Sequence, residues 1–170
     1  MPDHFQPTWR RGLAAGAVAA AAFFLPQEVP LEYYPLNNPS SGLHYLEITC
    51  AANVEGVTQI FLDYGAGLNQ LDSILWPIAP TSRPYTYTFP LKDAPIHELR
   101  LDPLFGAGEL TITNFRIHNR RDEEIRRFIR SDFTVVQQIT DIPPTPDGWK
   151  LMTTPDANDP IVHLNLPQPF

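Results

Sequence analysis

The distribution of proline is the feature of this sequence that most limits its fold. The chain has 170 residues with 19 prolines against 9 glycines, and the prolines occur from Pro2 to Pro169. Inside a helix, a proline removes one backbone hydrogen bond and clashes with the preceding turn, so this distribution leaves room only for short helices. Short strands joined by turns tolerate proline much better. The sequence therefore predicts an all-β domain.

Apolar residues alternate with polar residues along several short segments between the prolines. Residues 45–50, 58–64 and 85–91 show this period of two, which is typical of a strand with one buried face. Residues 73–78 are expected to be a short further strand that carries Trp76. We expect the first two segments to pair as an antiparallel hairpin. Together with two strands expected in residues 96–119, this makes at least six strands at roughly regular spacing, which predicts an antiparallel β-sandwich.

Residues 96–119 have the pattern of two strands on either side of a corner rich in proline and glycine. Pro103 ends the first strand because it donates no hydrogen bond and restricts the residue before it. We therefore interpret Asp102 as a turn residue. The pattern allows either a β-hairpin or a strand-loop-strand corner.

The second of these two strands changes its facing pattern along its length. Leu110 and Ile112 share one parity, whereas Phe115 and Ile117 share the opposite parity. A single extra residue near residues 113–114 would bring all four side chains to the same face. The sequence therefore predicts a β-bulge there.

Residues 122–130 predict the one short helix of the domain. Asp122 can cap its start, and acidic residues precede arginines along it, which suits the helix dipole. Ile125, Phe128 and Ile129 have the spacing of one apolar helical stripe.

The N-terminal part has the composition of an export signal. Arg10 and Arg11 precede an uncharged apolar run over residues 12–25, which as a helix is about 21 Å long, against about 30 Å for a membrane core. This favours a cleavable signal peptide. An uncleaved anchor in the inner membrane and a buried alanine-rich helix remain as alternatives. Either form of export puts the rest of the chain in the periplasm or outside the cell.

The sequence divides into four segments on these grounds. Residues 1–25 are expected to be the signal peptide or membrane signal-anchor, and residues 26–41, rich in proline, asparagine and serine, a linker. The β-sandwich is expected over residues 42–140. Residues 141–170 are expected to be a C-terminal extension with two further short strands.

Composition argues against several classes of function. The net charge is -7 and the isoelectric point is about 5.1, so we expect no nucleic-acid partner. The five histidines are isolated in the sequence, and the single cysteine, Cys50, has the pattern of a small buried residue. We therefore expect no metal and no other cofactor. The segment from Gly65 to Gly67 is not followed by a predicted helix, which argues against a nucleotide site.

The usual catalytic motifs are absent from the sequence, so we expect no enzyme activity. Tyrosine and tryptophan can stack on sugar rings, and Trp76 and Tyr64 lie next to turns. Asp63 and Asp72 are the carboxylates to consider for sugar binding or for glycoside hydrolysis. The alternatives are that the aromatic residues pack in the core and that the aspartates cap turns.

Several short stretches carry a resemblance to a known class of domain. They are LRLDP at residues 99–103, GAGELTI at 106–112, IFLDYGAGL at 60–68 and YTFPL at 87–91. In their order along the chain, within about residues 42–119, they resemble β-sandwich modules of bacterial cell-envelope proteins that accompany membrane glycosyltransferases and other polysaccharide-assembly proteins. The resemblance implies a jelly-roll fold like that of carbohydrate-binding modules, and no catalytic residue. Residues 149–166 resemble the start of a second such module.

Three hypotheses follow for the function. The first is a non-catalytic exported module that contacts cell-envelope glycan or a partner protein in polysaccharide assembly. The second is a structural or protein-interaction domain without affinity for sugar. The third is a glycoside-active enzyme that uses Asp63 and Asp72.

Overall fold

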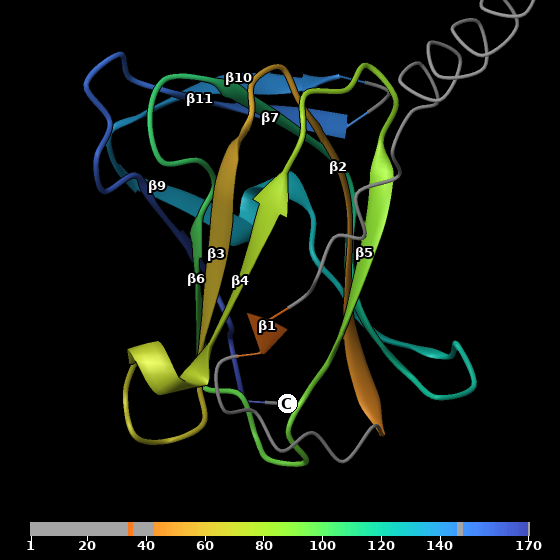
Figure 1. Cartoon of the computed structure of the whole chain (residues 1–170). Coiled ribbons are helices and arrows are strands. Elements are labelled where there is room, and N and C mark those ends of the chain that lie inside the picture. The colour runs from red at the N-terminus through yellow and green to blue at the C-terminus, as the bar shows by residue number, and fades with distance from the viewer. Residues whose placement is uncertain (1–33, 36–42, 146–147, 170) are drawn as a thin grey trace, which may run out of the picture. The chain divides into compact units, whose positions relative to one another are not determined.

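The computed structural model describes residues 34–35, 43–145 and 148–169 (Figure 1). The predicted export segment over residues 12–25 and all but two residues of the predicted linker lie outside the described residues. No helix among the described residues is long and apolar enough to cross a membrane.

The described residues form an antiparallel β-sandwich, which confirms the all-β prediction. Its two sheets are visible in Figure 1, with β3, β4 and β6 in one and β2 and β5 in the other. The first sheet has the strand order β1(Tyr34–Pro35), β4(Ser73–Ile78), β3(Gly56–Asp63), β6(Glu98–Asp102), β12(Ile161–Leu164), β9(Phe133–Gln137). The second sheet has the order β10(Ile139–Thr145), β11(Gly148–Thr153), β7(Glu109–Asn119), β2(His44–Ala52), β5(Tyr85–Pro90), and β8(Glu124–Arg127) also pairs with β7.

The core lies where the inner faces of the two sheets meet. On β2 the inward residues are Leu46, Ile48, Cys50 and Ala52, and all four are buried in one apolar cluster with residues of both sheets. The alternation predicted from the sequence therefore marks the buried face correctly. Burial also raises the pKa of the Cys50 thiol to about 12, so Cys50 is a packed and unreactive side chain.

Residues 96–119 form the corner rather than the hairpin. β6 belongs to the first sheet and β7 to the second, so the chain crosses the sandwich between them. The predicted bulge is confirmed in β7: Thr49 pairs with Asn114 and Cys50 pairs with Ile112, which leaves Thr113 as the extra residue.

The predicted hairpin between the first two strands is wrong. β2 pairs with β5 and β7 in the second sheet, whereas β3 pairs with β4 and β6 in the first. Both strands have one apolar face, and facing strands of opposite sheets show the same alternation as paired neighbours. The turn at residues 53–55 therefore joins the two sheets.

The predicted helix over residues 122–130 is also wrong, because this segment forms β8 and the 3₁₀ turn η2(Arg130–Asp132). The side chain of Asn119 accepts hydrogen bonds from the backbone N–H groups of Arg121 and Glu123, which turns the chain back along β7. The backbone of β8 then forms hydrogen bonds with the edge of β7 in place of the hydrogen bonds that a helix would form. The expected stripe does not form: Phe128 is buried, but Ile125 and Ile129 are exposed.

The strands after residue 140 lie within the same two sheets. β11 pairs with β7 in the second sheet, and β12 lies between β6 and β9 in the first. The domain boundary expected at residue 140 therefore does not coincide with a break in either sheet, because these strands bury the same core.

Candidate functional site

Trp76, the first predicted sugar-binding residue, lies in the core. It is buried on β4, with its ring centroid 4.9 Å from that of Phe89 and 5.9 Å from that of Tyr87. Burial raises the pKa of the Tyr87 phenol to about 12. In this position the indole cannot stack on a sugar, so the core interpretation of Trp76 holds.

Asp63, the second predicted residue, caps the turn after β3. Its Oδ1 accepts hydrogen bonds from the backbone N–H groups of Gly65 and Gly67, each at 2.7 Å. Both glycines have positive φ, which most other residues adopt only with strain. The carboxylate therefore orders the turn, as the alternative interpretation of Asp63 predicts.

Tyr64 and Asp72 meet at Lys92, a residue that the sequence did not single out. The Lys92 ammonium forms an ion pair with Asp72 and lies 5.1 Å from the centre of the Tyr64 ring. The backbone N–H of Lys92 donates a hydrogen bond of 3.4 Å to the Tyr64 hydroxyl. Asp63 and Asp72 thus both have structural partners. A glycoside hydrolase needs one carboxylate free to attack and one free to protonate the glycoside, and these two aspartates do not form such a pair.

Lys92 also lines a groove of about 360 Å³ at the connection between β5 and β6. The lining is mainly aliphatic and includes Leu91, Pro95, Ile96, Ile117 and Ile125, with Ala94. The polar residues that line it are His44, Lys92 and Asp93. The residues that line the groove come from β2, β7, β8 and the loop after β5, so no single stretch of sequence indicates the groove.

A charged cluster lies on the outer face of the second sheet. Glu47 on β2 and Arg116 on β7 are direct cross-strand partners, and the guanidinium donates to both carboxylate oxygens, at 2.8 and 3.0 Å. Arg116 also donates to Asp122 at 2.7 Å, and Asn114 donates to Glu47 at 2.7 Å. The hydrogen bonds from Arg116 hold the pKa of Glu47 below its ordinary value, although partial burial opposes this.

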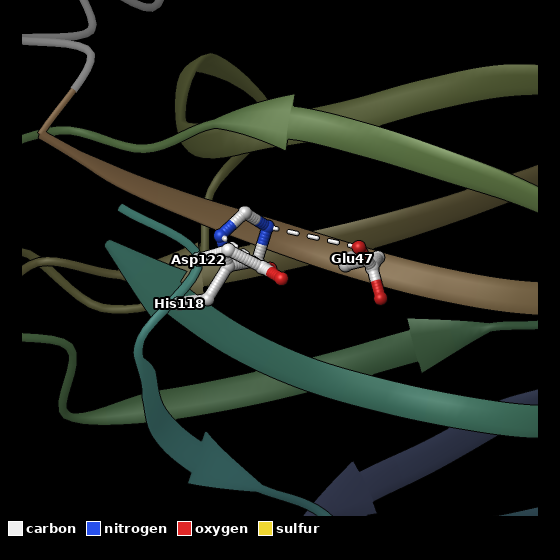
Figure 2. A group of neighbouring side chains, drawn as sticks. All are labelled: Glu47, His118 and Asp122. Atoms are coloured by element: carbon white, nitrogen blue, oxygen red, sulfur yellow. Dashed lines mark ion pairs between the residues drawn. The ribbon is translucent and has the colours of Figure 1, made fainter. Parts of the chain in front are cut away.

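His118 completes this cluster with Glu47 and Asp122 (Figure 2). Its ring is stacked on Tyr45, with the centroids 5.5 Å apart, and the residue is only 8% exposed. Nδ1 lies 2.9 Å from the carbonyl oxygen of Asn119, and Nε2 lies 3.8 Å from Oε2 of Glu47. The sequence did not bring these three residues together, because His118 is isolated from other histidines and Asp122 was predicted to cap a helix.

The Glu47–Arg116 pair predicts an acid-sensitive component of stability. Because the pKa of Glu47 is lowered in the folded state, its contribution is present above the ordinary value of 4.5 and is lost as the pH falls through the folded value. Glu47→Gln should lower the free energy of unfolding by about 2 kcal/mol at pH 7, and by less below pH 4.5.

Urea denaturation at a series of pH values measures this effect, with Glu55→Gln, at an exposed glutamate, as the control. A difference between wild type and Glu47→Gln that stays constant down to pH 3 would contradict the role of the ionised carboxylate.

The sequence matches no protein-family model, and comparison with curated proteins and with solved structures found no significant match.

Proposed function

We propose that the chain is a non-catalytic, exported binding module that contacts a partner protein in cell-envelope polysaccharide assembly. The observation that carries the proposal is the groove beside Lys92, which is concave, mainly aliphatic and bordered by a few polar groups. A hollow of this size and lining is typical of a binding site. The resemblance of residues 60–112 to envelope modules supplies the cellular setting, with the jelly-roll topology as part of the same proposal.

The lining of the groove favours an apolar side chain of a protein as its ligand. Leu91, Ile96 and Ile117 are buried in the protein, whereas Ala94, Pro95 and Ile125 are exposed, so a ligand would cover mainly the aliphatic surface of these three exposed residues. A sugar presents many hydroxyl groups, and each one loses its hydrogen bonds to water unless the site replaces them. Few groups in the lining can do so.

A glycan is the second candidate, and the polar edge of the groove favours it. Lys92 and Asp93 line the groove there, and the Lys92 ammonium contacts the ring of Tyr64 and the carboxylate of Asp72, which do not line the groove themselves. Such groups can bind sugar hydroxyls, and the tyrosine offers an aromatic surface. A glycan array probed with the full chain separates the two candidates, since binding to an envelope glycan would favour the sugar.

Ile125 provides the sharpest test of the groove. A photo-cross-linking amino acid at position 125 of the full chain, expressed in its native cells, should form one discrete protein adduct. The same group at position 129 should not, because Ile129 is 58% exposed but does not line the groove. With the captured partner purified, Ile125→Asp should weaken binding by about tenfold or more, and Ile129→Asp should have little effect.

The proposal fails if positions 125 and 129 give the same adducts, or if Ile125→Asp binds the purified partner as tightly as wild type. If position 125 forms an adduct with a glycan, the ligand of the groove is the second candidate, a glycan, and not a protein.

Export belongs to the proposal as well, and it rests on residues 1–25. A reporter enzyme that is active only outside the cytoplasm, fused after Pro26, should be active. If only a reporter that works in the cytoplasm is active, the chain is not exported and the envelope setting is wrong. The groove would then be a binding site for a partner in another compartment.

A further inference from the structure

We propose that Glu47, His118 and Asp122 form a binding site for a first-row divalent metal ion, with Zn²⁺ as the probe. The inference is independent of the proposed partner, because none of these three residues lines the groove. It rests on the geometry of the His118 ring, on the spacing of the three side chains and on the partners of the two carboxylates.

The hydrogen bonding of His118 leaves one ring nitrogen ready to bind a cation. A carbonyl oxygen can only accept, so Nδ1, 2.9 Å from the oxygen of Asn119, carries the proton of the neutral ring. Nε2 then presents a lone pair, and this buried atom has no hydrogen-bond partner in the part of the chain that the structure describes. A histidine that binds a metal commonly donates its other N–H to a backbone carbonyl in this way.

Nε2 points at Glu47, as the dashed line in Figure 2 shows, and lies 3.8 Å from its Oε2. In the neutral ring both atoms are acceptors, so the gap between them suits a cation. Metal bonds of about 2.0–2.2 Å to each atom place two ligands of one ion roughly 3–4 Å apart.

Asp122 can supply the third ligand. One donor atom from each of the three side chains lies within 4.8 Å of the others. Asp122 is on the turn between β7 and β8, and its side chain is 71% exposed. Its Oδ1 lies 3.7 Å from Nδ1 of His118, so this exposed side chain has to turn toward Nε2 to bind the same ion. A nitrogen and two carboxylate oxygens form a donor set that suits Zn²⁺ and its neighbours better than Mg²⁺ or Ca²⁺.

Arg116 sets the strength of the site. It donates hydrogen bonds to Glu47 and to Asp122, and these bonds orient both carboxylates without Arg116 itself binding the ion. The cluster of two carboxylates and one guanidinium has a net charge of about -1 with neutral His118, which favours a dication. The guanidinium also repels the ion, so we expect weaker binding than in a structural zinc site.

Isothermal titration of the full chain with Zn²⁺ tests the proposal, with Mg²⁺ and Ca²⁺ as comparisons. One Zn²⁺ should bind per chain, and EDTA should reverse it. His118→Gln should weaken this binding by more than about tenfold, because it removes a ligand. Removal of a residue that only hydrogen-bonds to a ligand already weakens metal binding about tenfold or more. His163→Gln is the matched control, because His163 is also a strand histidine beside a carboxylate, with Nδ1 2.7 Å from Glu98, and should bind Zn²⁺ like wild type.

Nitrogen-15 NMR of the histidine rings in the wild-type chain keeps the test independent of variant folding. Zn²⁺ should shift the Nε2 resonance of His118 and leave its Nδ1 protonated. The proposal is overturned if Zn²⁺ leaves this resonance unchanged, or if a folded His118→Gln chain binds Zn²⁺ as tightly as wild type.

Discussion

Trp76→Ala should lower the free energy of unfolding by about 3–5 kcal/mol, the range for removal of a large aromatic side chain from a core. The indole is buried between the sheets and touches the rings of Tyr87 and Phe89 from β5. Truncation would leave a cavity that strands on both sides cannot close without losing their sheet hydrogen bonds. Urea denaturation followed by circular dichroism measures the loss.

Tyr85→Ala is the matched control, since Tyr85 belongs to the same aromatic group but is exposed on β5. It should cost about 1 kcal/mol or less. A loss of under about 1 kcal/mol for Trp76→Ala would contradict the core position. The expected instability also means that loss of sugar binding in Trp76→Ala would not identify a sugar site, so variants at Ile125 are the better probes of function.

Asp102→Ala should cost about 3 kcal/mol, because it leaves the guanidinium of Arg100 without its buried partner. Asp102 ends β6, and its side chain is only 3% exposed. Arg100 donates to both of its carboxylate oxygens, at 2.7 and 2.8 Å. The sequence identified the end of the strand correctly, but the carboxylate forms an ion pair within the strand instead of the turn contact expected for it.

Asp159→Ala provides the comparison for this pair. Asp159 accepts a hydrogen bond of 2.8 Å from the same guanidinium, but its side chain is 53% exposed. Water can replace it, so its removal should cost less than about 1 kcal/mol. Equal losses for the two variants would show that burial does not set the strength of the Arg100 contacts.

Burial gives the Asp102 pair a defined pH dependence. It raises the pKa of Asp102 despite the opposing hydrogen bonds from Arg100. At Arg100, burial lowers the pKa, but the contacts with Asp102 and Asp159 outweigh it and the pKa is raised. A raised carboxyl pKa means that the folded state holds the proton more tightly than the unfolded state. The bound proton therefore stabilises the folded state by an amount that is full below the ordinary value of 3.8 and is lost as the pH rises through the folded value. The cost of Asp102→Ala at neutral pH has a different origin, the guanidinium of Arg100 left without its buried partner.

Features of the chain that depend on neighbouring residues were predicted well. Successive side chains of a strand point to opposite faces, so the alternation in residues 45–50 placed Leu46, Ile48 and Cys50 on one face, which is the buried one. The change of parity within residues 109–119 located the bulge for the same reason. The turn after β3 is closed by Asp63 and its two glycines, all within five residues.

Features that depend on which strands become neighbours were decided by the tertiary structure. The alternation in β2 and β3 is the same whether they pair or face each other across the core, so their sheets could not be assigned. The segment after Asn119 has a helical pattern, but the free edge of β7 offers it sheet hydrogen bonds instead. The groove at Ile125 and the cluster of Glu47, His118 and Asp122 both depend on that pairing. The sequence by itself therefore determined which side chains face inward, whereas only the packing of distant strands brought the candidate binding residues together.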